Sequence, residues 1–302
     1  MTLRTSAIAL LALATAAPAA AKGAADPACD RACLDRMADK VLAAMADRAP
    51  ERLPFAKVVR YSENNVSIDI GDGAWATITA HGAAALRAAD PATGQVVWMG
   101  EIAEHGQPGF MALRLKVEDG KVAEIEAVIR RKGGPPQYGD PEAYKPDPAF
   151  AASAGREAPK TMVTAIDGWL DAVQGKRGAA RIAPGCERQD NGVASSTGAT
   201  ADGGVQGCAA QIRAGVFKPI ETVRARRYIV DAARGVVVAA GFYDLPSATP
   251  KPAAGKDFSW AEDFPYSLGF ISAFKLKDGA VWRIDTISNA QPYLMPSPWG
   301  GR

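Results

Sequence analysis

An internal repeat constrains the fold more than any other feature of the sequence. Residues 115–126 read LKVEDGKVAEIE and residues 274–285 read FKLKDGAVWRID, so the same pattern recurs at an offset of 159 residues. Two weaker matches precede it, YSENN (61–65) with RQDNG (188–192) at an offset of 127, and ADPATGQVVW from Ala89 with VDAARGVVVA from Val230 at 141. Matches in the same order at growing offsets indicate a duplicated domain.

The growing offset predicts that the second copy is longer. The extra residues fall near the Gly/Ser/Thr-rich stretch Ala194–Gly207 and in the Pro-rich stretch Pro246–Pro265. Extended loops on a compact scaffold often carry binding residues, although a loop without function explains them equally well. A length of 302 residues agrees with two domains, since one domain takes roughly 150 residues.

Each copy is expected to begin with an amphipathic helix. In the first copy, Asp30 can cap a helix whose hydrophobic residues recur at helical spacing. These residues are Leu34, Met37, Val41, Leu42 and Met45. The second copy repeats the spacing with Met162, Ala165, Ile166, Trp169 and Val173.

Strands follow the helix. Residues 66–70 alternate and predict a strand that ends in a GDG turn, and the Ala-rich segment His81–Ala89 predicts a short helix. Three hydrophobic runs then predict strands at 95–104, 110–118 and 122–130. The fold class is therefore α+β, with two tandem cone-shaped domains, each a helix packed on a curved antiparallel sheet.

The first 21 residues have the pattern of a secretory signal. Arg4 precedes an apolar run and then small residues up to Ala21. A membrane anchor would need about 18 to 20 strongly apolar residues, so we expect cleavage and a periplasmic or secreted protein. The expected divisions are a signal peptide (1–21), a first domain (22–131), a Pro/Gly-rich linker (132–159), a second domain with two insertions (160–288) and an extended tail (289–302). In that tail, Trp299 either docks on the other domain or is exposed.

Four cysteines follow the signal. An even number in an exported chain favours disulfides over free thiols. Three pairings are possible, of which we favour Cys29 with Cys33 and Cys186 with Cys208. A zinc site is the alternative, but CxxxC without a second close pair or a histidine is poor zinc spacing.

Composition and missing motifs exclude several functions. Lys plus Arg number 35 against 33 Asp plus Glu, which is too balanced for nucleic acid or an anionic membrane as principal partner. The GxSxG, GxxxxGK and GxGxxG motifs do not occur, and His81 and His105 form no metal cluster in the sequence. We therefore expect no hydrolase, kinase or Rossmann chemistry and no metal site.

The helix, the Tyr61 segment, AADPATGQVVWMG and LKVEDGKVAEIE resemble the nuclear transport factor 2-like superfamily, which includes SnoaL-like cyclases and ketosteroid isomerase. CDRACL, RYSEN, DGKVAEIE, RRYIVD and PYLMPSPW are similar to a poorly characterised secreted family of fungi and proteobacteria that carries two such domains. The resemblance implies a cofactor-independent pocket for a hydrophobic aromatic molecule inside each cone. It extends to lyases that release formaldehyde from lignin-derived aromatic dimers.

Deformylation of such a dimer needs a base, an acid and donors near the phenol oxygen. Glu101 is the one carboxylate in the apolar strand 96–102. A raised pKa would suit catalysis if Glu101 points into a dry cone, whereas at the strand's solvent edge it would be ordinary. His81, at the start of the predicted short helix, is either an acid–base group or a helix cap.

Tyr61 and Glu63 are the other catalytic candidates, with Arg60 beside them. Tyr61 and Arg60 could hold a phenolate, or they could be a packed aromatic and a rim ion pair. In the repeat, Arg188 and Asp190 take the positions of Tyr61 and Glu63, which suggests two divergent pockets. The remaining substrate-binding candidates, equally explained by packing, are Trp98, Asp244, Trp260 and Tyr266.

Three functions agree with the sequence. The first is a cofactor-free enzyme, either a lyase that converts a lignin-derived dimer to a stilbene or an isomerase or dehydratase of a polycyclic or polyketide-like substrate. The second is a noncatalytic carrier, and the third is a structural protein whose two cones pack together. A cone without a cavity of about 300 Å³ would favour the third. The sequence leaves a homodimer open.

Overall fold

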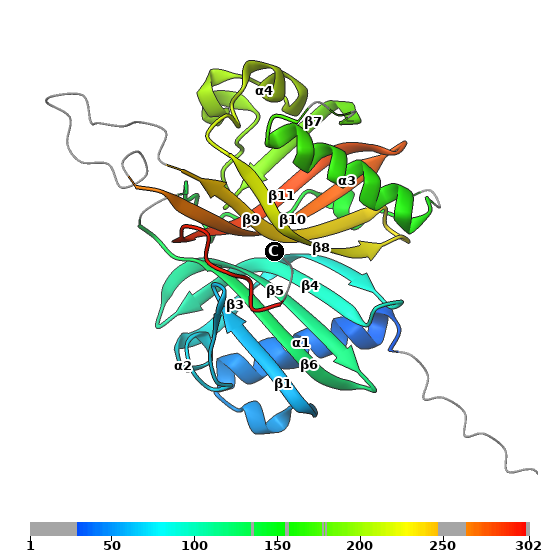
Figure 1. The fold of residues 1–302 in the computed structure, drawn as a ribbon. Helices are drawn as coiled ribbons and strands as arrows, with labels where there is room; N and C mark the ends of the chain where they lie inside the picture. Colours follow the sequence, from blue (N-terminus) through cyan, green and yellow to red (C-terminus); the bar gives the residue numbers. More distant parts are fainter. Residues whose placement is uncertain are drawn as a thin grey trace, which may run out of the picture.

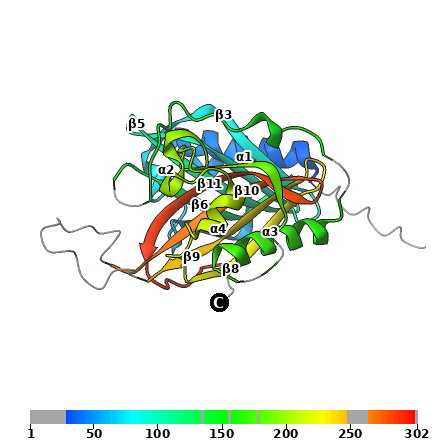
Figure 2. The same cartoon turned by 90° about the horizontal axis from the view of Figure 1, so that it is seen from above.

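Two β-sheets stack face to face, and each carries a helix on its far side (Figure 1; Figure 2). The structure is a computed structural model that describes residues 29–133, 136–154, 157–176, 178, 180–246 and 264–299. The expected signal peptide, residues 1–21, lies outside these residues. The α+β class with two domains is confirmed.

The first domain holds a helix and a six-stranded sheet. Its elements are α1 (Arg31–Asp47), η1 (Pro50–Arg52), β1 (Phe55–Glu63), β2 (Val66–Ser67), α2 (Ala74–Thr77), β3 (Ile78–Asp90), β4 (Gln95–Glu104), β5 (Gln107–Glu118) and β6 (Lys121–Arg130). The strand order is β2-β1-β6-β5-β4-β3. Since β1 runs parallel to β6, the sheet is mixed rather than purely antiparallel as expected.

The second domain repeats this plan after a linker that contains η2 (Pro148–Phe150). Its elements are α3 (Pro159–Val173), β7 (Ile182–Asp190), η3 (Gly198–Thr200), η4 (Asp202–Gly204), α4 (Cys208–Ala214), β8 (Thr222–Asp231), β9 (Val236–Leu245), β10 (Tyr266–Lys277) and β11 (Ala280–Pro292). The strand order is β7-β11-β10-β9-β8, with β7 parallel to β11.

An asparagine that follows the first strand shows how closely the copies agree. The Asn64 amide donates to the carbonyl of Ala127 at 2.8 Å, and its side chain accepts from the amide two residues further along β6 at 2.8 Å. Asn191 makes the same two bonds with Thr286 and the second residue beyond it, at 2.8 and 2.9 Å. Both asparagines have positive φ, which this residue tolerates.

Two local predictions are wrong. Residues 81–89 form part of strand β3, not a helix, because they pair along β4 with irregular register between His81 and Ala85. Tertiary pairing here overrides the helical preference of alanine. The strand expected at 66–70 is limited to Val66–Ser67, and Ile68 and Ile70 pack against the core instead.

The helical predictions hold. Asp30 caps α1 by accepting from the Cys33 amide at 2.8 Å. We call the face of each sheet that its own helix covers the inner face, and the opposite face the outer face. α1 packs on the inner face of the first sheet and α3 on the inner face of the second. The outer faces of the two sheets meet in a central layer that includes Leu86, Val97, Met99, Phe110, Ile229, Val238, Ile271 and Ile287.

Polar contacts across the central layer join equivalent residues of the two copies. The Ala89 amide donates to Asp231 at 3.2 Å, and the Val230 amide donates to Asp90 at 3.2 Å. These bonds are exchanged between equivalent residues, so the domains are related by an approximate two-fold axis. Both aspartates are buried, which makes the bonds costly to break.

The linker and the tail are more structured than the sequence indicated. Tyr144 and Phe150 of the linker are buried in the central layer. β11 continues to Pro292, beyond the expected domain end at residue 288. Trp299 docks on the first domain, where its indole donates to Ser62 Oγ at 3.1 Å and its ring lies 4.7 Å from the guanidinium groups of Arg60 and Arg114.

The favoured cysteine pairing is confirmed. Cys29 bonds to Cys33 and Cys186 to Cys208, with Cα atoms 5.3 and 5.6 Å apart. Two disulfides are compatible with an extracellular protein. In the part of the chain that the structure describes, every helix is too short or too polar to cross a membrane.

Candidate functional site

A cavity of about 160 Å³ lies in the second domain, between α3 and the inner face of the sheet. Its apolar walls include Trp169, Val173, Phe217, Ile220, Leu245 and Leu268. It occupies the interior of the cone, where the resemblance implies a pocket. At about 160 Å³ it is smaller than the roughly 300 Å³ below which the sequence analysis favours a structural protein, so volume alone does not support a ligand pocket for a large molecule.

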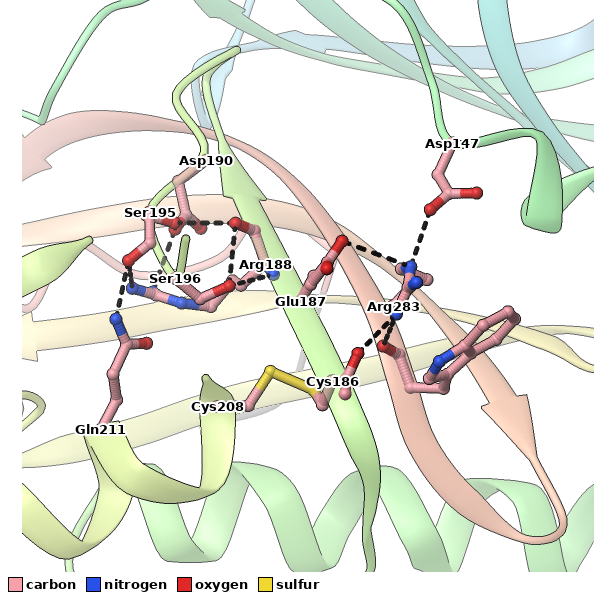
Figure 3. The surroundings of a disulfide bond; sticks show 12 residues. Asp147, Cys186, Glu187, Arg188, Asp190, Ser195, Ser196, Cys208, Gln211 and Arg283 are labelled. Atoms are coloured by element: carbon pink, nitrogen blue, oxygen red, sulfur yellow. Dashed lines mark hydrogen bonds and ion pairs between the residues drawn. A yellow bond between two sulfur atoms is a disulfide. The ribbon is translucent and has the colours of Figure 1, made fainter. Parts of the chain in front are cut away.

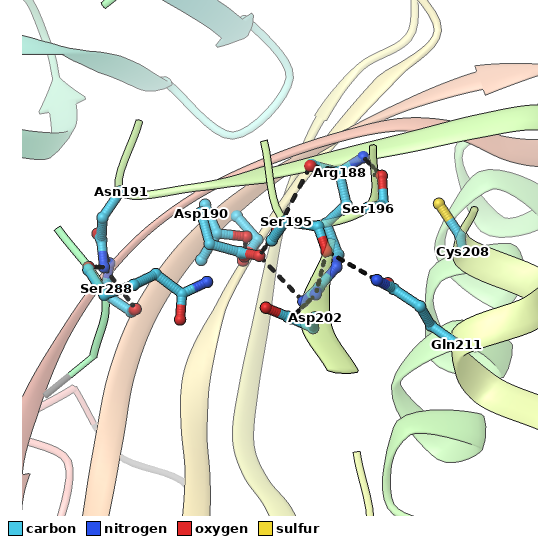
Figure 4. A network of polar contacts seen from close by, with 12 residues as sticks. Arg188, Asp190, Asn191, Ser195, Ser196, Asp202, Cys208, Gln211 and Ser288 are labelled. Atoms are coloured by element: carbon cyan, nitrogen blue, oxygen red, sulfur yellow. Dashed lines mark hydrogen bonds and ion pairs between the residues drawn. The ribbon is translucent and has the colours of Figure 1, made fainter. Parts of the chain in front are cut away.

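Polar side chains gather at one end of this cavity (Figure 4). Arg188 and Asp190 come from the end of β7, and Asp202 comes from the insertion. Arg188 Nη1 lies 3.0 Å from Asp190 Oδ2, and its Nη2 binds Asp202. Ser195 Oγ donates to the same oxygen of Asp190. The guanidinium group is thus held between two carboxylates.

Arg188 keeps one unused donor. Its guanidinium group lies 4.8 Å from the ring centre of Phe217, and only 9% of the side chain is exposed. Within the described residues, its Nε is buried and has no hydrogen-bond partner. Because an unpaired buried donor is unfavourable, an oxygen of a bound molecule would improve the site.

The surroundings raise the pKa values of two side chains at the cavity, Asp202 and Tyr243. Burial and the nearby Asp190 raise the pKa of Asp202, although Arg188 opposes them. Burial and Asp190 also raise the pKa of Tyr243, which faces the cavity from β9. Tyr243 therefore stays protonated and can donate a hydrogen bond. Asp202 can hold a proton more readily than an exposed aspartate.

The insertion between β7 and α4 is fixed by covalent and polar contacts (Figure 3). The Cys186–Cys208 disulfide ties α4 to β7. Gln211 on α4 donates to the carbonyls of Ser195 and Val205, at 2.7 and 2.9 Å. These contacts hold the segment that supplies Asp202 and, beyond α4, the apolar wall of the cavity.

The cone of the first domain is packed with large side chains. Trp75, Trp98 and Tyr61 are at most 3% exposed and belong to its core. Trp98, a predicted substrate-binding residue, contacts His81 edge to face at 6.0 Å. Tyr61 occupies the position that Arg188 holds in the second copy, as the repeat predicts.

The structure brings Tyr61 and Glu63 together. Tyr61 Oη donates to Glu63 Oε2 at 3.2 Å, and the Ala74 amide donates to the same oxygen at 2.6 Å. Arg131 binds the other Glu63 oxygen at 2.8 Å and also binds Glu104. Burial and Glu63 raise the pKa of Tyr61. This network anchors α2 to the sheet.

Arg60 does not join Tyr61, because successive strand residues face opposite sides of a sheet. It binds Glu124 at 2.5 Å on the outer face. Arg60 and Tyr61 both line a concavity of about 200 Å³, which Trp299 also lines, but their side chains point to opposite faces of the sheet and so do not converge on one phenolate oxygen. The alternative, a rim ion pair beside a packed aromatic, is what the structure contains.

Glu101 does not point into the cone. On β4 it shares the outer face with Val97 and Met99, which belong to the central layer. Partial burial raises its pKa, followed by the charges of Glu142 and Asp140. His81 is exposed on β3, on a strand rather than at the start of a helix.

The last candidates lie apart from the cavity. Asp244 is fully buried on the outer face of β9, where Arg224 binds it at 2.7 Å and Ser267 at 2.5 Å. Tyr266 begins β10, and burial raises its pKa. Trp260 lies outside the described residues. The sequence analysis noted Arg188 and Asp190 only as equivalents of Tyr61 and Glu63, and it missed Asp202 and Tyr243 as site residues.

The fold and site define a two-domain α+β protein with one hollow and one packed cone. Residues 155–288 match a family described as a domain of unknown function, DUF8021. This match covers the second domain and less than half of the chain. No curated protein sequence matched.

Several solved structures are each similar to less than half of this chain. A protein from Jannaschia sp. CCS1 assigned as a SnoaL-like polyketide cyclase is 14% identical, with 45% of this chain and 92% of that chain covered and a TM-score of 0.31. A protein from Kribbella flavida DSM 17836 assigned as a ketosteroid isomerase is 17% identical, covering 39% and 91%, with a TM-score of 0.25. A de novo designed protein with a curved β-sheet is 11% identical, covering 44% and 88%, with a TM-score of 0.28.

Proposed function

We propose that the second domain binds a ring-sized hydrophobic molecule that carries a carbonyl or hydroxyl oxygen, and catalyses proton transfer on it without a cofactor. The arrangement of Arg188 between Asp190 and Asp202, at one end of an apolar cavity, carries the proposal. A lyase or an isomerase would use such chemistry. The proposed reaction class is the one that the sequence favours, but the proposed residues are those of the second domain, not Glu101, His81, Tyr61 and Glu63.

Each polar group has a distinct role. The unpaired Nε–H of Arg188 and the hydroxyl of Tyr243 would bind the substrate oxygen as negative charge develops on it. Asp190 is the base, because one of its oxygens is occupied by Arg188 and Ser195 and the other remains available. Asp202, whose pKa is raised, is the candidate to return a proton.

Charge and volume limit the substrate. Asp190 compensates the charge of Arg188 even when Asp202 holds a proton, so a neutral molecule fits better than an anion. An apolar cavity of about 150 Å³ holds one benzene ring, which is close to the 160 Å³ found here. A two-ring lignin-derived dimer would place only one ring inside, so we favour a single-ring substrate.

Deuterium exchange tests the proposal without knowledge of the final product. The chain from Lys22 onward would be incubated in D₂O with single-ring ketones such as phenylacetone, without added metal or cofactor. Mass spectrometry would follow deuterium entering the carbon next to the carbonyl. We expect catalysed exchange in the native protein and a decrease of roughly 100-fold or more in Asp190→Asn, with Glu118→Gln at a distant surface unchanged.

The outcomes separate the competing functions. Ligand-induced stabilisation without exchange in the native protein would favour a noncatalytic carrier. Loss of exchange in Glu101→Gln or His81→Ala, with Asp190→Asn fully active, would return the site to the residues that the sequence analysis favours. Neither binding nor exchange across the panel would favour a structural role for both cones.

A further inference from the structure

A second concavity lies on the outer side of the second domain, between the linker and the β7 edge of the sheet. This groove has a volume of about 480 Å³ and is formed by residues 145–150, β7 and β11. Asp147, Glu187 and Arg283 stand on this side of the strands (Figure 3). Asp285 and Gln189 also line the groove. It is separate from the cone, and Arg188 is the polar residue that borders both.

Asp285 is the unusual group in this groove. It is 2% exposed, and its Oδ2 accepts from Tyr144 Oη at 2.9 Å and from Gln189 Nε2 at 3.3 Å. Its Oδ1 is buried without a hydrogen-bond partner among the described residues. Burial raises the pKa of Asp285 to about 7, so near neutral pH the carboxyl is divided between its charged and neutral forms.

The internal repeat shows what a carboxylate at this position binds in the other copy. Glu126 is the equivalent of Asp285, at the same offset of 159 residues that relates the hairpins. Arg114, directly across the strand pair, donates to Glu126 at 2.6 Å. Arg227 from the other domain adds two bonds, at 2.8 and 2.6 Å. Burial alone would raise the pKa of Glu126, but these two guanidinium groups lower it.

The second copy lacks those cations. The residue across the strand pair from Asp285 is Ala273, where the first copy has Arg114. Arg283 is already bound by Asp147 at 2.7 Å and lies 3.7 Å from Glu187. The charged and titratable groups around Asp285 are Tyr144, Lys145, Asp147, Glu187, Arg188, Asp190 and Arg283. Of these, Asp190 and Asp147 further disfavour its ionisation.

We propose that this groove binds a guanidinium group, which compensates the charge of Asp285 as Arg114 and Arg227 compensate that of Glu126. The group comes either from a small guanidino compound or from an arginine side chain of a peptide. A guanidinium donor would satisfy the buried Oδ1 and compensate the carboxylate charge. The site does not depend on the proposed proton transfer, because it lies outside the cone.

Calorimetric titration of the chain from Lys22 onward tests this site. The probes are agmatine, N-acetylarginine methylamide and the neutral isostere N-acetylcitrulline methylamide. At pH 8 we expect both guanidinium probes to bind, with citrulline roughly tenfold weaker or worse. Affinity for the cations should fall between pH 8 and pH 6, because protonated Asp285 cannot compensate them. A tighter arginine probe would indicate a peptide, and tighter agmatine a free compound.

Two variants complete the test. Asp285→Asn should weaken the guanidinium probes roughly tenfold or more, whereas Asp278→Asn, in the β10–β11 turn outside the groove, should bind as the native protein does. Equal binding of citrulline and arginine would overturn the proposal, as would native affinity in Asp285→Asn or no binding at pH 8. The comparison of probes and pH uses native protein, so it holds even where a variant folds poorly.

Discussion

At equivalent positions the two copies carry different side chains, and these differ in their polar contacts. Tyr61 completes a packed core, while its equivalent Arg188 stands at a cavity with an unpaired donor. Glu126 is compensated by two arginines, while Asp285 has only a tyrosine and an amide. The backbone is alike in both cases. The two copies therefore differ at the level of side chains.

The buried Asp285 predicts how stability depends on pH. Its pKa rises on folding from 3.8 to about 7. Between these values the folded state holds a proton that the unfolded state releases, so stability falls as pH rises from about 4 to about 7. The loss attributed to this group is on the order of a few kcal/mol.

Asp285→Asn removes that titration and should be more stable than the native protein at pH 8, with a smaller difference near pH 4. Urea unfolding at a series of pH values measures this. Asp278→Asn serves as the control at an exposed site. A pH dependence that is unchanged in Asp285→Asn would show that the carboxyl is not perturbed by burial.

At the scale of elements, the insertion after β7 distinguishes the hollow cone from the packed one. It adds Asp202 to the lining of the cavity, and the segment after α4 adds Phe217 and Ile220 to the wall. The first copy has only a short connection at this point, which contains α2. Trp75 of α2 is buried in the first core.

The disulfide that holds the insertion should matter for both stability and binding. Replacing Cys186 and Cys208 by serine should cost about 3 kcal/mol of unfolding free energy and weaken binding of single-ring ligands, because the wall loses its anchor. Chemical unfolding and ligand titration measure the two effects. Replacing Cys29 and Cys33, which lie at the start of α1, should leave ligand affinity unaltered. Native affinity in the Cys186/Cys208 variant would show that α4 does not hold the cavity closed.

Sequence reasoning succeeds where the signal is local. The Asp-Gly hairpins and the helical spacing of the two helices predict elements that the structure contains. It fails for β3, where alanines pair in a strand because β4 is available. It also leaves open which face of the sheet Glu101 occupies, because register and the choice of face depend on the whole sheet. Asp202 could not be found, since its contact with Arg188 depends on how the insertion folds back.

At the scale of the whole molecule, the two sheets pack face to face and share one central hydrophobic layer. The two exchanged bonds, from the Ala89 amide to Asp231 and from the Val230 amide to Asp90, follow the approximate two-fold symmetry of this layer. Trp299 continues the second domain across the first, between Arg60 and Arg114. The first domain thus packs against the second. Of the two cones that the structure describes, the second contains the cavity that we propose to be functional.

The location of a bound ring tests this account most directly. Crystals would be soaked with 4-bromophenol, whose bromine gives an anomalous signal and whose hydroxyl can reach Arg188 or Tyr243. We predict a bromine peak in the cavity between α3 and the second sheet, and a phenol oxygen within hydrogen-bond distance of Arg188 Nε. A peak inside the first cone beside Trp75 and Tyr61, or no peak in either cone at saturating ligand, would contradict it.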